Sequence, residues 1–192
     1  MSHAITTEIK ALLRTRTKSS AFESAKRLIA FKSKVASSKI INALRPELKD
    51  FHREALVYAL TFRCDVEGID PLVALLSDDK EVPRIRGQAA EGIAYSLESV
   101  RRSSTRWRRA VEAILQGLGD PAHEVRFWCV FAVATLKIRA AASALETLAA
   151  SDEAISVLGW TVAEEAKDAL HVLRTGSWPS PDASDRHEAC RG

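Results

Sequence analysis

The sequence of 192 residues predicts an all-α protein in which antiparallel helix pairs stack into a solenoid. Three observations predict this fold. An apolar helix, a short polar turn and a second helix rich in small residues recur four times along the chain. Within these helices the apolar residues return every three or four positions, which gives each helix one apolar stripe. No segment alternates apolar and polar residues in the way that a half-buried strand does.

The second helices of the four repeats align without gaps from their first residues, which are His52, Ile85, Val125 and Val162. Their eighth position is always small and their ninth is always aliphatic. These residues are, in order, Ala59 and Leu60, Gly92 and Ile93, Ala132 and Val133, and Ala169 and Leu170. Successive second helices start 33, 40 and 37 residues apart, within or near the periods of known helical-pair repeats. The small eighth position predicts close approach between neighbouring helices.

The first helices of the pairs are predicted by apolar stripes within residues 40–44, 72–76, 111–118 and 145–148. The turns between pair members hold Asp or Ser, which can cap the free N–H groups of a following helix. Residues 7–13 and 21–31 predict one further, degenerate helix pair at the N-terminal end.

This pattern predicts one domain over residues 1–174. Within it, residues 1–35 cap the repeats of residues 36–174. Residues 175–192 are rich in Ser, Pro and Asp and predict a flexible C-terminal tail.

Two of the repeats, residues 72–94 and 113–136, resemble HEAT repeats of the short bacterial type. The motif of that family places Asp in the turn and a Val-Arg pair at the start of the second helix, and Asp120 with Val125 and Arg126 matches it fully. The resemblance extends over roughly residues 36–174 and implies a right-handed α-solenoid. In the family the turn Asp and the helix Arg typically bond along the array, which implies structural roles for Asp120 and Arg126.

The other repeats match this motif less fully. Asp79 with Ile85 and Arg86 matches closely, Arg53 lacks the preceding apolar residue, and Ala163 stands where the last repeat would have Arg. HEAT-like solenoids serve as scaffolds, adaptors, transport receptors and inhibitors, and a few are enzymes or nucleic-acid binders. The resemblance therefore implies an architecture and leaves the function open.

Composition narrows the class of protein. No apolar run approaches the ~18 residues that a membrane span requires, and the N-terminal residues lack the apolar core of a secretory signal. The cysteines Cys64, Cys129 and Cys190 are odd in number and widely spaced, which argues against a disulfide framework. We therefore expect a cytoplasmic protein that does not associate with membranes.

Charge is distributed unevenly along the chain. Residues 1–50 carry 11 Lys and Arg against 4 Asp and Glu, whereas residues 51–192 carry 17 against 21. Such asymmetry steers association with charged partners. A second basic cluster surrounds Trp107. Its members are Arg101, Arg102, Arg106, Arg108 and Arg109.

The second helices line the concave side of HEAT-like arrays, so the resemblance implies that their third, fourth, seventh and eleventh positions face a groove. The residues at these positions are acidic toward both ends of the array and aromatic in its centre. The expected partner-binding residues are Glu54, Tyr58, Glu91, Tyr95, Phe127, Trp128, Phe131, Glu164 and Asp168. Such a groove would favour a protein with a basic surface, for which the aromatic side chains supply buried anchors.

The helix that opens at Val125 is apolar on nearly every side. A solenoid helix needs only one apolar stripe, so Phe127, Trp128 and Phe131 have two interpretations. Packing of neighbouring helices covers them, or they form an exposed aromatic patch that binds a partner or a second copy of the chain.

Motifs for catalysis or metal binding are missing from the sequence, which lacks G-x-S-x-G, a P-loop, a Rossmann fingerprint, H-E-x-x-H and C-x-x-C. Glu164, Glu165 and Asp168 form a carboxylate cluster on one helix face, which is typical of a solvated surface. We therefore expect no enzyme activity, no cofactor and no metal.

These observations favour a non-catalytic protein-interaction module, such as a scaffold, an adaptor or an inhibitor of the immunity-protein kind, and they leave a homodimer open. The alternative is a nucleic-acid-binding protein similar to the HEAT-like DNA glycosylases. The basic N-terminus and the arginine cluster would then bind phosphates while Trp107 stacks on a base. The expected groove is acidic, however, and Val111 stands one turn after Trp107, where an acidic residue would be needed.

Overall fold

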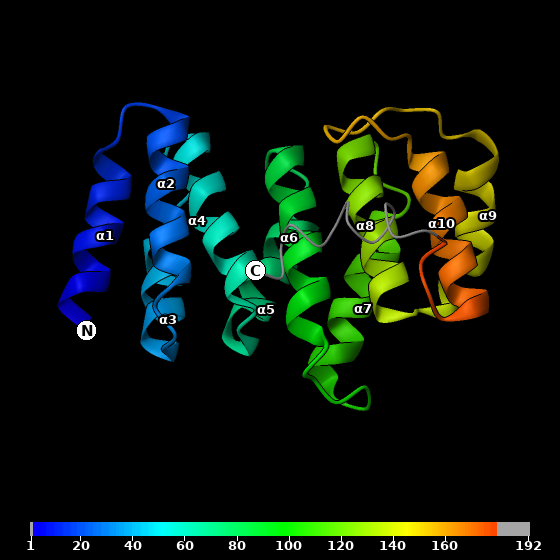
Figure 1. Ribbon diagram of the computed structural model, residues 1–192, viewed down its shortest axis with the longest axis horizontal. Coiled ribbons are helices and arrows are strands. Elements are labelled where there is room, and N and C mark those ends of the chain that lie inside the picture. The colour runs from blue at the N-terminus through cyan, green and yellow to red at the C-terminus, as the bar shows by residue number, and fades with distance from the viewer. Residues whose placement is uncertain (1, 180–192) are drawn as a thin grey trace.

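The computed structural model describes residues 2–179 of the chain. Its helices stand side by side along one long axis, from α1 at one end to α9 and α10 at the other (Figure 1). In chain order they are α1 (Ser2–Arg14), α2 (Lys18–Ile29), α3 (Lys34–Ala43), α4 (Asp50–Arg63), α5 (Ile69–Ser77), α6 (Pro83–Leu97), α7 (Thr105–Gly117), α8 (His123–Leu136), α9 (Ala142–Ser151) and α10 (Val162–Thr175). The short 3-10 helices η1 (Val66–Gly68) and η2 (Arg139–Ala141) precede α5 and α9. The predicted all-α solenoid is thereby confirmed.

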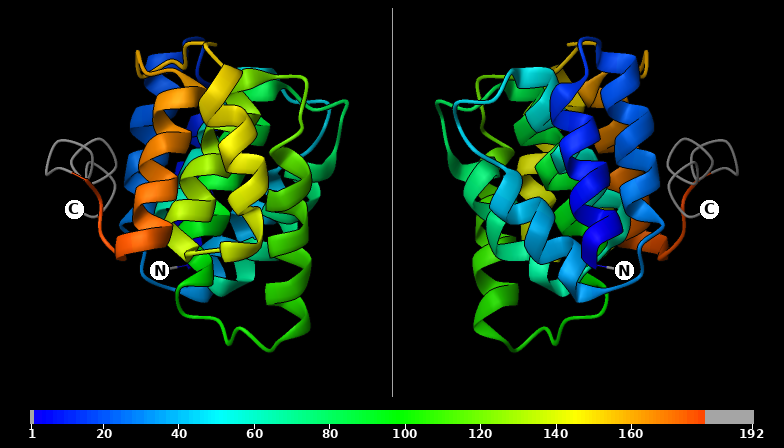
Figure 2. Two further views of the ribbon diagram at one scale, coloured as in Figure 1. Left: turned by 90° about the vertical axis from the view of Figure 1, so that its right-hand side faces the viewer. Right: turned by 90° about the vertical axis from the view of Figure 1, so that its left-hand side faces the viewer.

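The even-numbered helices form one layer, because α2, α4, α6, α8 and α10 pack on one another in chain order. The odd-numbered helices form the outer layer, in which α1 contacts α3 and α5 contacts α7. Figure 2 shows the array from its two ends, with α7 at the outer edge and α10 on the opposite side. Each inner helix is one of the predicted second helices, except α2, which belongs to the N-terminal pair.

The core follows the positions that the alignment predicts. The first, fifth and eighth residues of all four second helices are buried, and only Leu170 among the ninth residues is half-buried. Gly92 shows why the eighth position is small. A Cβ atom on it would lie 2.7 Å from Oγ1 and 3.1 Å from Cα of Thr61, so α4 and α6 approach each other too closely for a side chain there.

Three ion pairs, which we call the ladder, join consecutive repeats at one edge of the array. In each, an Arg near the start of an inner helix binds an acid in the turn before the next inner helix. The pairs are Arg53–Glu81, Arg86–Asp120 and Arg126–Asp152. The expected structural roles of Asp120 and Arg126 are confirmed, because Arg126 Nη1 also donates to the main-chain oxygen of Asp120 at 2.7 Å. Glu81 replaces Asp79 in the ladder, and Asp79 is exposed.

The end of α10 corrects the expectation of a free tail from residue 175. Gly176 ends the helix in the left-handed region (φ 84°), and the chain turns back so that the Trp178 ring stacks on Phe131 of α8. Their ring centroids are 6.2 Å apart. Residues 180–192 of the expected tail lie outside the described part of the chain. Among residues 2–179, no helix is long and apolar enough to cross a membrane.

Candidate interaction surface

A chain of touching aromatic rings, which we call the aromatic stripe, runs across the inner helices. Its members are Phe22 of α2, Tyr58 and Phe62 of α4, Tyr95 of α6, Trp128 and Phe131 of α8, and Trp178 after α10. Ring centroids are 4.5 Å apart between Tyr58 and Phe62, and 6.1 Å apart between Phe62 and Tyr95. The stripe continues from Tyr95 to Phe131 at 5.8 Å. It therefore crosses the repeats without a break in ring contact.

Helical spacing places these rings in rows. Tyr58 and Phe62 are four residues apart on α4, so their side chains lie one above the other on the same helix face. Tyr95 occupies the position on α6 that Phe62 occupies on α4. It meets Phe131 of α8 nearly edge to face, with an interplanar angle of 71°. Edge-to-face geometry is favourable for aromatic pairs because the positive ring edge meets the negative ring face.

Exposure divides the expected aromatic residues into two groups. Tyr58, Tyr95 and Trp128 are half-buried and lie at the surface, as does Phe62. Phe127 is fully buried and Phe131 is 2% exposed. The expectation that these two side chains are open to a partner in the groove is therefore wrong. Phe127 packs edge to face against Trp128, and Phe131 is enclosed by Tyr95, Trp128 and Trp178.

Two of the expected groove acids are already engaged within the chain. Glu54 is 9% exposed and forms ion pairs with Lys18 at 2.8 Å and Arg84 at 3.5 Å, so its charge is compensated. Glu164 belongs to the capping box of α10, where its carboxylate accepts the N–H of Thr161 at 2.8 Å. These two residues stabilise the repeats, and the expectation that they select basic side chains of a partner is corrected.

The remaining acids differ in burial. Glu91 is 4% exposed and accepts a hydrogen bond from the Tyr95 hydroxyl at 3.2 Å and another from the Gln88 amide. Asp168 is half-buried at the corresponding position of α10. Glu165 is fully buried, which contradicts the expectation of a solvated carboxylate cluster on α10. The face of α10 on which it lies packs against α8 and α9.

The arginine cluster lies in the outer layer, on or just before α7, and is not brought together with the aromatic stripe. Arg106 and Arg109 approach Asp70 of α5 at 2.8 Å and 4.0 Å. The Arg102 guanidinium lies over the Trp107 ring, 5.2 Å from its centroid. Two of the five arginines are therefore compensated by a carboxylate, and a third covers the indole.

Side chains of the types that bind a metal ion or act as a nucleophile also occur among residues 2–179. No group of three or more His, Cys, Asp or Glu side chains in this range could hold a metal ion. Cys129 is fully buried, and this burial raises the pKa of its thiol far above the ordinary value, so the thiolate is disfavoured.

Sequence reasoning missed two members of the stripe, Phe22 and Trp178. Phe62 stands at an eleventh position of the alignment, which the sequence places on the groove side. Phe22 lies in α2, outside the four aligned repeats. Trp178 follows the last predicted helix, and no pattern in the sequence indicates that it folds back on Phe131.

No family model matches the chain, and no curated protein matches it. Among solved structures, the complex of CpcE and CpcF of phycocyanin lyase from Nostoc sp. PCC7120 is similar at 16% identity, with all of both chains covered and a TM-score of 0.69. Human deoxyhypusine hydroxylase is similar at 14% identity over 99% of this chain and 95% of that chain, with a TM-score of 0.42. The fold and the first of these likenesses define the chain as an all-helical solenoid of stacked helix pairs.

The expected absence of enzyme activity stays a prediction after these comparisons. The similar complex is that of phycocyanin lyase, and this activity is a property of that complex. At 16% identity the likeness shows the fold alone.

Proposed function

We propose that the chain is a protein-binding helical repeat module that holds a partner protein along the aromatic stripe. The observation that carries the proposal is the unbroken ring contact across four inner helices, with Tyr58, Phe62, Tyr95 and Trp128 half-buried at the surface. Half-buried aromatic side chains are the residues that most often anchor a protein interface, because they bury a large area and lose little side-chain entropy.

The proposed partner carries an apolar segment with a basic side chain. Asp168 lies at the seventh position of its aligned helix, as Tyr58 and Phe131 do, and is half-buried. A cation beside this carboxylate would gain charge complementarity, which contributes more to specificity and association rate than to affinity. The likeness to a complex of two chains is consistent with a protein partner. Scaffold, adaptor and inhibitor roles all use such a surface, and so does a homodimer.

Nucleic-acid binding is the less well supported alternative. Asp70 compensates Arg106 and Arg109, and Arg102 covers one face of the Trp107 indole. A base would need that face for stacking.

The proposal is tested by affinity capture from a native lysate, with and without nuclease, followed by identification of the captured protein. Tyr95→Ala and Trp128→Ala remove stripe anchors, and Phe51→Ala is a matched control, because Phe51 is half-buried on α4 but touches His52 and Lys49 instead of the stripe. We expect a protein that is captured by the parent and by Phe51→Ala and is lost from both stripe variants.

Circular dichroism of each variant establishes that the helices are intact. Capture of the same protein by the stripe variants would contradict the proposal. So would recovery of nucleic acid alone, released by raised salt, because counterion release makes phosphate binding strongly salt-dependent. A homodimer would be detected by light scattering of the purified parent, and its loss in Tyr95→Ala would place its interface on the stripe.

A further inference from the structure

The outer layer is interrupted between α7 and α9. Helix α7 packs against α5 and α8, and α9 packs against α10, but α7 and α9 have at most marginal contact with each other. Two adjoining hollows of about 520 Å³ and 510 Å³ lie along α7 and share Arg102, Trp107 and Val111. The second also borders residues 136–140, which precede α9. We call the two hollows together the outer cleft.

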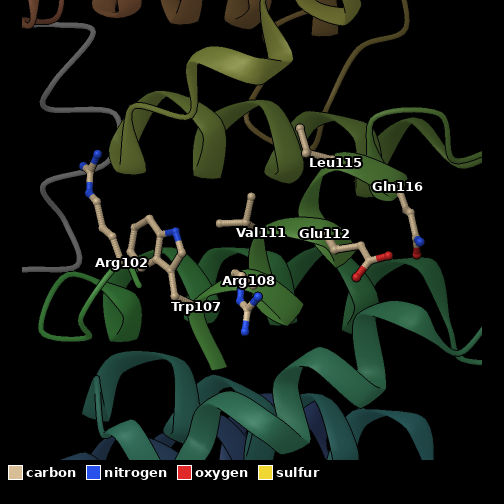
Figure 3. Close-up of a pocket in the computed structure, with 7 residues that line it drawn as sticks. All are labelled: Arg102, Trp107, Arg108, Val111, Glu112, Leu115 and Gln116. Atoms are coloured by element: carbon tan, nitrogen blue, oxygen red, sulfur yellow. The ribbon is translucent and has the colours of Figure 1, made fainter. Parts of the chain in front are cut away.

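The floor of the outer cleft is apolar. Trp107, Val111 and Leu115 follow one another at intervals of four on α7 and are all half-buried. Figure 3 shows these three side chains on the same side of α7, with Arg102 beside the indole. Ile138, which is 8% exposed, continues the floor into the second hollow. A stripe of this spacing is the face that a helix normally buries against a neighbour.

The rim of the outer cleft is cationic. Arg102 and Arg108 border the first hollow, and Lys137 and Arg139 border the second. Glu112 is the one carboxylate that lines either hollow. Within the described part of the chain, none of the four cations forms an ion pair. Arg102 and Lys137 donate only to main-chain oxygens of other segments, at 3.1 Å and 2.9 Å.

From this combination we infer that the outer cleft is a second docking site, which takes an acidic peptide segment with an apolar anchor from a partner protein. The apolar floor accepts the anchor, and the uncompensated rim favours carboxylates on either side of it. Nucleic acid fits less well, because Arg102 lies over the indole at 5.2 Å and would have to leave before a base could stack there. The cleft lies in the outer layer, so its occupant need not compete with a partner on the aromatic stripe.

The test is an NMR titration of the isotope-labelled full chain, followed at the indole N–H of Trp107, which Trp107→Phe assigns. The probes are a synthetic amphipathic peptide of Glu and Leu, the matching peptide of Lys and Leu, and single-stranded oligothymidine. We expect only the first peptide to shift the Trp107 signal. Arg108→Glu with Arg139→Glu should weaken its binding by about tenfold or more. The control is Lys10→Glu with Arg16→Glu, which makes the same charge change at exposed N-terminal positions and should leave the affinity unchanged.

Three results would overturn the inference. These are equal shifts with both peptides, a shift with oligothymidine instead of the acidic peptide, and equal weakening by the control pair. Tyr95→Ala separates the two proposed sites. It should leave the titration unchanged, so failure of the stripe proposal does not count against the cleft.

Discussion

Replacement of Arg126 by Met should destabilise the array far more than the same change at Arg106. Arg126 binds Asp152 through Nε at 2.6 Å and Nη2 at 3.0 Å, and its Nη1 donates to the main-chain oxygens of Asp120 and Pro121. The Arg126 side chain is 18% exposed and that of Asp152 is 10% exposed. Met preserves the apolar stem and removes only the charged head.

The expected loss follows from this burial. Removing one partner of a fully buried ion pair costs about 3–5 kcal/mol, because the other charge is left without compensation. Exposed pairs contribute about 0–1 kcal/mol. The Arg126 pair is mostly buried, so we expect a loss of about 2–3 kcal/mol in the free energy of unfolding. Arg106 also donates through Nε and Nη2, but both reach the same Asp70 oxygen, and the side chains are 41% and 45% exposed. Arg106→Met should therefore cost less than about 1 kcal/mol.

The assay is urea unfolding followed by far-UV circular dichroism, with the midpoint and slope recorded for the parent and both variants. Because α9 and α10 form the end repeat, hydrogen exchange in α10 should also speed up in Arg126→Met, ahead of exchange in α4. Equal losses in the two variants, or a loss below about 1 kcal/mol in Arg126→Met, would refute the link between burial and the strength of the ladder.

The remaining predictions concern acid stability, helix contact and thiol reactivity. Burial on its own raises the pKa of Asp152, but hydrogen bonds and charge from Arg126 outweigh it and hold that pKa below its ordinary value. In Arg126→Met only burial acts, so the Asp152 carboxyl takes up a proton at a higher pH than in the parent. The stability gap between the parent and Arg126→Met should therefore be complete near neutral pH and narrow in urea titrations as the pH falls through the range in which the Asp152 carboxyl titrates. Gly92→Ala should lower the thermal midpoint, because the clash with Thr61 outweighs a helix-propensity gain of about 1 kcal/mol. Gly119→Ala is the control and should not lower it, because the nearest atom to the added Cβ is 3.7 Å away. Iodoacetamide should modify exposed Cys64 in the native chain but reach buried Cys129 only after denaturation. Peptide mass spectrometry measures the extent of labelling, and equal labelling of the two thiols in the native chain would contradict the packing of α8.

The fold was predictable because the residues that build it repeat. Small residues at the eighth position, such as Gly92, mark where inner helices touch, and the turn acid with the helix Arg marks the ladder. Both signals are local and lie within one repeat. The choice of Glu81 over Asp79 was not predictable in this way, because it depends on which side chain reaches Arg53 of the preceding repeat.

The surface was only partly predictable, because exposure depends on neighbours far along the chain. Tyr58, Tyr95 and Trp128 lie at the surface as the alignment indicates, but Phe131 is covered partly by Trp178, more than forty residues later. Glu165 is buried because α10 turns that face toward the array. Periodicity places a residue on a helix face and does not say what covers that face.

The ladder also determines how this chain could change in length. Each ion pair joins only adjacent repeats and uses an Arg at the second position of an inner helix and an acid in the segment before the next inner helix. A whole repeat inserted between two others would bring one Arg and one acid and so complete both of its junctions. A fragment of a repeat would leave an Arg facing no acid. Growth and shortening by complete units are therefore the changes that the architecture tolerates at low energetic cost.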